Sequence, residues 1–193
     1  IVSMDGTDQK AYSSYRIAGD FNKVLEGISN VSFWKKKLNS KTPFLELQFL
    51  VLRSNEHQVD EIKRLGKSLG VDKVTLKTAQ VYDLDHGESL IPRNEKYSRY
   101  KKNVNGKYSI KSKLPDYCWR MWSSTVITWD GRIVPCCFDK DADHQLGTVE
   151  PDGFIRTWKG KTYQAFRKKV FSDRKQIGIC NNCTEGLSRN IKP

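Results

Sequence analysis

The chain has 193 residues, of which 37% are hydrophobic, and a formal net charge of +12. This length suits one domain or two small ones, and the composition excludes a globally disordered chain. No run of about 18 apolar residues and no signal peptide is visible, so we expect a cytoplasmic protein with no membrane partner. The chain begins at Ile1 without an initiator Met, and we expect it to be part of a longer protein.

The positive charge predicts attraction to polyanions, and nucleic-acid binding is one interpretation of it. Nucleic acid is not favoured, because the charge is spread along the chain and no helix-turn-helix, zinc-finger or RNA-recognition pattern occurs. The densest basic stretch, residues 93–113, mixes Tyr97, Tyr100 and Tyr108 with lysines and arginines. A solvated loop is the simplest interpretation of this stretch, and binding of an anionic substrate or RNA is the alternative.

The first half of the chain predicts alternating strands and helices. Residues 1–5 have the composition of a strand end. A helix is predicted from Phe21, with Asp20 as its N-cap, because apolar residues recur there at helical spacing. The dense apolar run 43–52 predicts a strand that is buried on both faces.

Residues 54–70 predict a second helix, with Ser54 as its N-cap and Gly70 as its stop, and residues 71–82 predict a third strand. Such alternation implies an α/β fold with parallel strands and right-handed crossovers. Three parallel strands leave two open edges. We therefore expect residues 1–84 to be the C-terminal half of a partial (β/α) barrel.

Residues 85–117 predict a long, basic connecting segment with little periodicity. The last part, residues 118–193, predicts a small α+β module. It contains a predicted hairpin around Asp130 and Gly131, a dipeptide that favours a type I′ turn. A single helix is predicted over residues 154–171, because aromatic and apolar side chains recur there at helical spacing.

Five cysteines lie in this last part: Cys118, Cys136, Cys137, Cys180 and Cys183. An odd number without a secretory signal argues against a disulfide framework, and clustered cysteines more often hold metal. Strand-borne cysteines are predicted before and after the hairpin, and the final Cys-x-x-Cys turn can point two thiolates at one ion. Four thiolates suit tetrahedral zinc or an iron–sulfur cluster, and the spacing alone favours neither.

Adjacent cysteines on an extended segment face opposite ways, so only one of Cys136 and Cys137 is expected to reach a shared site. Cys137 by itself is most simply interpreted as a small buried side chain. His144 is near this pair in sequence and is an alternative extra ligand. A solvent-exposed loop histidine is the simpler interpretation.

The stretches "CWRMWSSTVITWDGRIVPCC", "LG" and "CNNC" resemble the auxiliary-cluster module, called SPASM or the shorter "twitch", of radical S-adenosylmethionine (SAM) enzymes. The resemblance implies that one [4Fe–4S] cluster is held by Cys118, Cys136, Cys180 and Cys183, with Cys137 as the alternative to Cys136. A full SPASM module has seven cysteines and two clusters, so five cysteines fit the shorter version. That version occurs in the dehydrogenase of butirosin biosynthesis, which oxidises an aminocyclitol.

The first half is similar to the same family. "IVSMDGTDQKAYSSYR" resembles a barrel strand in which Ser3 and Arg16 face SAM, and Asp5 would lie at the same barrel mouth as a candidate catalytic residue. Asn55 occupies the usual "N-x-H" turn of the following strand and helix. The simpler interpretations are that Ser3 and Asp5 cap a strand end, that Arg16 pairs with Asp20, and that Asn55 caps its helix.

The resemblance implies a radical SAM oxidoreductase in the full-length protein. The C-x-x-x-C-x-x-C motif of the SAM-cleaving cluster is absent, since no cysteine precedes Cys118. We therefore expect SAM and a second [4Fe–4S] cluster only in the full-length protein, and no activity from this chain alone. The auxiliary cluster would transfer an electron or position the substrate after hydrogen abstraction by a 5′-deoxyadenosyl radical. Trp119, Trp122 and Trp129 would shield that cluster or form ordinary core.

The substrate stays open between a sugar or aminocyclitol, a peptide, and nucleic acid. The resemblance implies a reducing partner such as flavodoxin or ferredoxin. Two alternative functions remain: a structural zinc-binding module without redox chemistry, and an RNA- or peptide-modifying radical SAM relative that holds its substrate with residues 93–113.

Overall fold

The computed structural model describes residues 1–82, 84, 87–150 and 153–185. Contacts between residues divide the chain into two compact units, Ile1–Lys111 and Ser112–Pro193. No helix in the described part of the chain is long and apolar enough to cross a membrane.

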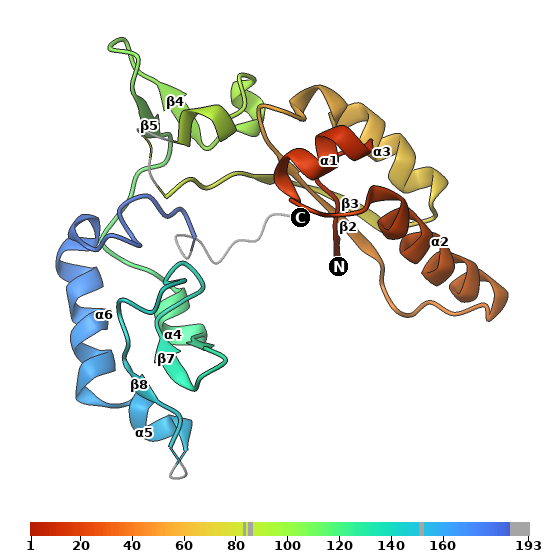
Figure 1. Cartoon of the computed structure of the whole chain (residues 1–193). Coiled ribbons are helices and arrows are strands. Elements are labelled where there is room, and N and C mark those ends of the chain that lie inside the picture. The colour runs from red at the N-terminus through yellow and green to blue at the C-terminus, as the bar shows by residue number, and fades with distance from the viewer. Residues whose placement is uncertain (83, 85–86, 151–152, 186–193) are drawn as a thin grey trace. The chain divides into compact units, whose positions relative to one another are not determined.

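A three-stranded parallel sheet forms the centre of the first unit. Its strands, in spatial order, are β1 (Val2–Ser3), β2 (Glu46–Val51) and β3 (Lys73–Thr78), and the helices between them are α1 (Gln9–Tyr15), α2 (Phe21–Lys37) and α3 (Val59–Ser68). Figure 1 shows these helices gathered around the sheet. The predicted α/β class and the parallel pairing are confirmed. Closure into a partial barrel stays a prediction.

Two helices of this unit begin at aspartate caps. The Asp20 carboxylate accepts a hydrogen bond from the N–H of Lys23 at 3.1 Å, which confirms the predicted start of α2. The Asp8 carboxylate caps α1 in the same way, accepting from the N–H of Ala11 at 2.8 Å. Helix α1 was not expected, because seven residues are too few to display a clear helical period.

The second predicted helix begins later than expected. A 3₁₀ turn spans Glu56–Gln58 and α3 starts at Val59, so the prediction of Ser54 as N-cap is wrong. Asn55 precedes the 3₁₀ turn, and its side chain hydrogen-bonds to the backbone of Leu50 and Leu52 at the end of β2. The predicted stop is confirmed, since Gly70 has a φ of +69°, a conformation that favours glycine.

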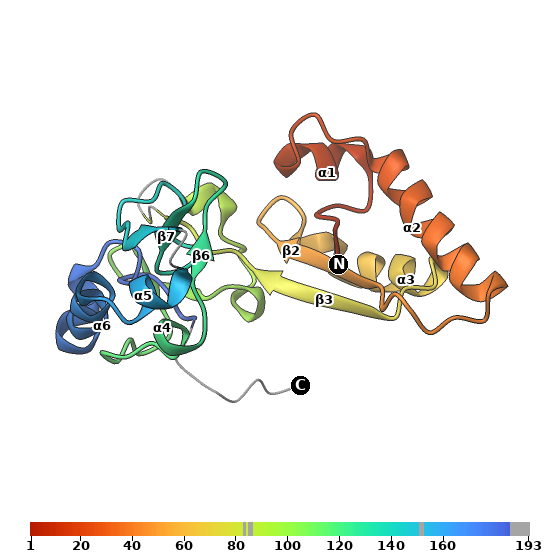
Figure 2. The same cartoon turned by 90° about the horizontal axis from the view of Figure 1, so that it is seen from below.

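Strand β2 is fully buried on one face only, which corrects the expectation of two buried faces. The buried residues are Leu47, Phe49 and Val51. Helix α3 covers this face closely at Gly66, where an added Cβ would lie 2.3 Å from a methyl group of Val74 (Figure 2). On the opposite face, the half-buried Gln48 pairs with Ser3 in β1 and Thr75 in β3. The sheet therefore has one apolar face beneath a helix and one polar face.

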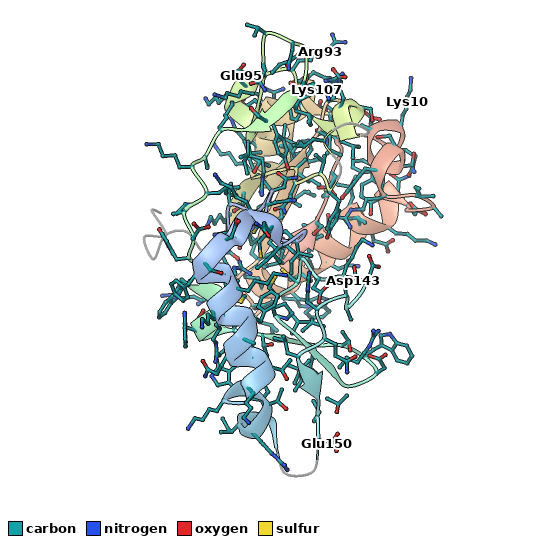
Figure 3. The ribbon with its side chains drawn as sticks, turned by 90° about the vertical axis from the view of Figure 1, so that its left-hand side faces the viewer. Lys10, Arg93, Glu95, Lys107, Asp143 and Glu150 are labelled. Carbon is teal, nitrogen blue, oxygen red and sulfur yellow. The ribbon has the colours of Figure 1, made fainter. Side chains whose placement is uncertain are left out.

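The region expected to be a basic connection, residues 85–117, is folded over much of its length. Its described elements are the 3₁₀ turns Gly87–Leu90 and Glu95–Tyr97 and the antiparallel strands β4 (Tyr100–Lys102) and β5 (Tyr108–Ile110). Val81, Ile91 and Tyr100 of β4 form a small core, and Figure 3 shows the labelled residues Arg93 and Lys107 in this region. A local core thus packs much of this segment into the first unit.

The second unit combines a small antiparallel sheet with short helices. Its elements are α4 (Arg120–Ser123), β6 (Val126–Ile127), β7 (Arg132–Val134), β8 (Gly147–Thr148), α5 (Phe154–Trp158) and α6 (Lys161–Asp173). The predicted hairpin is confirmed as β6–β7. The helix predicted over residues 154–171 is two helices, because the extended backbone of Gly160 interrupts it and starts α6. The end of the predicted module, residues 186–193, lies outside the described residues.

The turn of the β6–β7 hairpin is not of type I′. That type needs a positive φ at both central residues, but of Asp130 and Gly131 only Gly131 has one, at +82°. The N–H of Thr128 donates to the carbonyl oxygen of Arg132 at 2.9 Å, and the N–H of Gly131 donates back to Thr128 at 3.0 Å. The hairpin therefore closes through a three-residue loop that ends in a left-handed glycine.

We predict that Asn55→Ala strongly destabilises the first unit. Asn55 is fully buried, its Oδ1 accepts from the N–H of Leu52 at 2.7 Å, and its Nδ2 donates to the carbonyl oxygens of Asp5 and Leu50 at 2.9 and 3.0 Å. Truncation leaves these buried backbone groups unpaired, so the free energy of unfolding should fall by about 2–4 kcal/mol. Urea denaturation measures this, with hydrogen exchange assigning the loss to the first unit.

The matched control is Asn30→Ala, which removes an exposed asparagine from helix α2. It should change the free energy of unfolding by less than about 0.5 kcal/mol. Equal effects of the two substitutions would contradict a structural role for the Asn55 amide.

Candidate metal centre

Four of the five cysteines face the core of the second unit. Cys118, Cys180 and Cys183 are buried, Cys136 is half-buried, and Cys137 is exposed. The two neighbours therefore face opposite ways, as predicted for Cys136 and Cys137. The expectation that Cys137 is a small buried side chain is wrong, because Cys137 is exposed while its neighbour Cys136 packs against the core that contains Cys118 and Cys180.

The four inward cysteines come from loops and turns, not from strands. Cys118 lies just before Trp119, the N-cap of α4, and Cys136 follows β7 after one intervening residue. Both positions correct the expectation of strand-borne cysteines. Cys180 and Cys183 lie in the turn that follows α6, where the N–H of Cys183 donates to the carbonyl oxygen of Cys180 at 3.3 Å. Three separate segments thus contribute thiols to one core.

The thiols are close enough to influence one another electrostatically. Burial raises the pKa of Cys136 to about 11 and that of Cys180 to about 12, and the pKa of Cys183 is also raised by burial. The other three thiols add to the rise at Cys180. The thiols of Cys118 and Cys183 also contact one carbonyl oxygen, that of Glu185, at 3.9 and 4.0 Å. These interactions define the thiol core as Cys118, Cys136, Cys180 and Cys183.

One buried arginine holds the segments of the thiol core together. The Arg174 side chain is 1% exposed and donates through Nη1 to the carbonyl oxygen of Tyr117 at 2.6 Å. Its Nη2 donates to Cys183 at 2.7 Å and Glu185 at 3.3 Å, and its Nε donates to Cys180 at 3.4 Å, all at carbonyl oxygens. No sequence pattern marks this residue, because Arg174 lies in an ordinary basic stretch without a motif.

The exposed Cys137 lies beside a surface ion pair. Its thiol is 4.0 Å from Nη1 of Arg120, and Nη2 of the same guanidinium bonds to the Glu185 carboxylate at 2.9 Å. The loop that follows is folded by Asp139, whose carboxylate accepts the N–H of His144 at 3.0 Å. The His144 ring packs on Phe166 with 5.4 Å between centroids and is half-buried, so it is not the solvent-exposed histidine that was expected.

The three tryptophans near the first cysteine do not form ordinary core. Trp119 and Trp122 are 38% and 45% exposed, and Trp129, near the tip of the β6–β7 hairpin, is 96% exposed. Trp122 packs instead on the buried Arg167, whose guanidinium carbon lies 4.5 Å from the ring centroid. Shielding of a cluster by these rings stays a prediction for Trp119 and Trp122 and is not supported for the exposed ring of Trp129.

The donor chemistry of the thiol core suits iron or zinc. Four thiols without a competing carboxylate or imidazole form a soft donor set, which suits both zinc and an iron–sulfur cluster. Among the described residues, no three His, Cys, Asp or Glu side chains are arranged to hold a single metal ion as they stand. Tetrahedral zinc would bring thiolates to roughly 3.8 Å from one another, given Zn–S bonds of about 2.3 Å.

In the first unit, three of the predicted SAM-side and catalytic residues meet at the carboxyl ends of β1 and β2. The Asp5 carboxylate is 1% exposed and accepts from Nε of Arg16 and from the N–H of Leu50, both at 2.7 Å. Arg16 therefore pairs with Asp5, not with Asp20. Asn55 bonds to the carbonyl oxygen of Asp5, and the exposed Ser3 lies one strand position before Met4 and faces the polar side of the sheet.

These contacts give Asp5, Arg16 and Asn55 structural roles. Asp5 is held by two donors, and both hydrogens of the Asn55 amide bond to backbone carbonyls. Of the Arg16 side chain, 40% is exposed, so part of the guanidinium faces solvent. The catalytic role of Asp5 and the SAM-side roles of Ser3, Arg16 and Asn55 stay predictions.

Comparison with known proteins supports the metal centre. Residues 118–184 match the SPASM family, described as an iron–sulfur cluster-binding domain. The predicted resemblance of this region to that family is thereby confirmed, and the match spans all four thiols of the core. Among solved structures, the crystal structure of selenomethionine BtrN in an open conformation matches with a TM-score of 0.33 and 12% sequence identity. That comparison covers 84% of this chain and 64% of the BtrN chain.

We predict that the buried thiols react slowly in the metal-free protein. At pH 8, a thiol with a pKa of about 12 holds roughly a thousandfold less thiolate than one at the ordinary value of 9.0. Iodoacetamide should therefore modify the exposed Cys137 first and Cys180 last. The rate at Cys180 should rise about tenfold per pH unit between pH 8 and 10, which peptide mass spectrometry measures.

The control is the same reaction in concentrated urea, where burial is lost and the five rates should converge. Modification of Cys180 as fast as Cys137 in the folded protein at pH 8 would contradict the buried thiol core.

Proposed function

We propose that the second unit is an auxiliary cluster-binding module of the twitch type, in which the thiol core holds one [4Fe–4S] cluster. The observation that carries this proposal is the gathering of four thiols in one buried core, with the fifth cysteine outside it. The match to an iron–sulfur cluster-binding domain over residues 118–184 supports it. Cys136 is the preferred ligand over its neighbour, because Cys137 is exposed and beside Arg120.

A cluster is favoured over zinc by the match of residues 118–184 to an iron–sulfur cluster-binding domain. In a [4Fe–4S] cluster each thiolate binds a different iron atom, so the four ligands stand further apart than they do around one ion. When bound, a cluster with four protein ligands has no open iron site and supplies one-electron transfer. The apolar side chains packed around the thiol core would exclude water from the cluster, and Arg174 would hold the cysteine segments in place.

For the whole protein, we propose a radical SAM oxidoreductase in which the first unit is the C-terminal part of a partial barrel. The polar face of the β1–β2–β3 sheet supports this, because a parallel sheet is usually covered on both faces unless one of them lines a cavity. SAM and a second [4Fe–4S] cluster belong to that full-length protein. Its substrate class is a sugar, an aminocyclitol or a peptide, and its electron donor is a low-potential protein such as flavodoxin or ferredoxin in the cytoplasm.

Anaerobic reconstitution with iron and sulfide tests the proposal. We predict about four irons per chain and a broad absorbance band near 400 nm. Both should be lost in the variant C180A/C183A, because two of four ligands are gone. Measured iron content and the absorbance spectrum report the outcome.

The matched control is Cys137→Ala, which removes the exposed cysteine and should leave the iron content and the spectrum unchanged. Tight binding of one zinc with no stable iron would replace the proposal by a structural zinc module. Loss of the cluster in the Cys137 variant would show that the ligand set is misassigned.

A further inference from the structure

Arg174 is a buried cation whose guanidinium has no carboxylate partner among the described residues. The four hydrogen-bond partners of its guanidinium are all neutral carbonyl oxygens, those of Tyr117, Cys180, Cys183 and Glu185. The acidic side chain in this set, Glu185, gives its carboxylate to Arg120 instead. The Asp116 carboxylate accepts from the backbone N–H of Arg174 at 2.9 Å. A buried charge is normally paired, because removal from water without compensation is strongly unfavourable. The unit therefore contains a buried guanidinium whose own hydrogen bonds all go to neutral groups.

That charge lies beside the thiol core. Arg174 donates to the carbonyl oxygens of two of the four core cysteines, Cys180 and Cys183. Through Tyr117 it also reaches the residue that precedes Cys118. One guanidinium thus ties the first cysteine segment to the last two cysteines.

We propose that Arg174 is a positioning residue that holds the ligand segments and supplies the positive charge that stabilises a bound, negatively charged iron–sulfur cluster. This inference rests on the proposed function and deepens it. Four thiolates around a [4Fe–4S]²⁺ core carry a net charge of 2−, and uptake of one electron makes it 3−. A nearby cation stabilises the reduced form more than the oxidised form, so Arg174 raises the reduction potential.

A second buried arginine provides the matched control. Arg167 is 2% exposed and lies in the same unit, but it is enclosed by the rings of Trp122, Trp158 and Tyr163 and donates to the carbonyl oxygens of Met121 and Trp158. None of its described hydrogen bonds goes to a cysteine. Its replacement therefore reports what the loss of a buried guanidinium does to this core in general.

The experiment compares the wild-type chain with R174Q, R174K and R167Q after anaerobic reconstitution with iron and sulfide. R174Q removes the charge, and R174K keeps the charge but loses the planar fork. Iron content, circular dichroism of the metal-free proteins, and a redox titration with dithionite as the electron donor, followed by EPR, are measured on each. Absence of a cluster from the wild type would refute the proposed function itself, independently of Arg174.

With a cluster in the wild type, we expect R174Q to disfavour the reduced state by about tenfold or more, which corresponds to about 59 mV in a one-electron couple. R174K should lie closer to the wild type, and R167Q should match it. Loss of iron from folded R174Q, with iron retained by R167Q, would likewise support the role of Arg174 at the ligands.

Three results would overturn the inference. The first is an unchanged potential and iron content in R174Q. The second is an equal loss of iron or of folding in R174Q and R167Q, which would make Arg174 an ordinary core residue. The third is unfolding of metal-free R174Q and R174K while R167Q stays folded, which would assign Arg174 to the fold and not to the bound cluster.

Discussion

The second unit depends on one constraint: thiols from three separate segments must lie in one small buried core. The β6–β7 hairpin carries the chain from the first cysteine segment to the second, and α6 returns it to the turn of Cys180 and Cys183. Burial disfavours the charged thiolate and raises the pKa of these groups. Cys136, Cys180 and Cys183 are therefore neutral thiols in the metal-free chain, and a metal group would displace their protons when it binds.

Two buried arginines stabilise this core in different ways. Arg167 is surrounded by three aromatic rings at 4.1–4.5 Å from their centroids, an arrangement in which the negative ring faces compensate its charge. The guanidinium of Arg174 donates to four backbone carbonyls, all from the segments that contain or flank the cysteines. The Arg167 guanidinium packs α6 against the surrounding aromatic rings. The Arg174 guanidinium places a positive charge where four thiols meet.

In the first unit, too, the polar side chains at the strand ends are hydrogen-bonded to one another and to the backbone. Asp5, Arg16 and Asn55 satisfy one another and the backbone at the carboxyl ends of β1 and β2, which is the edge where parallel sheets collect functional groups. These residues fix the strand ends, and the polar face beside them remains half-buried. A site at this edge would use the exposed part of Arg16, because the buried Asp5 carboxylate is occupied by two donors.

The sequence alone determined the features that depend on local pattern: the parallel strand–helix alternation, the Asp20 cap, the Gly70 stop, the β6–β7 hairpin and the resemblance of the cysteine pattern to a cluster-binding module. Each is set by residues a few positions apart or by cysteine spacing. Only the tertiary structure decided that Cys137 is exposed, that Asp5 pairs with Arg16, and that Arg174 lies among the cysteines. These features depend on segments far apart in the chain, and no local pattern records which distant carbonyl or carboxylate a buried cation will meet.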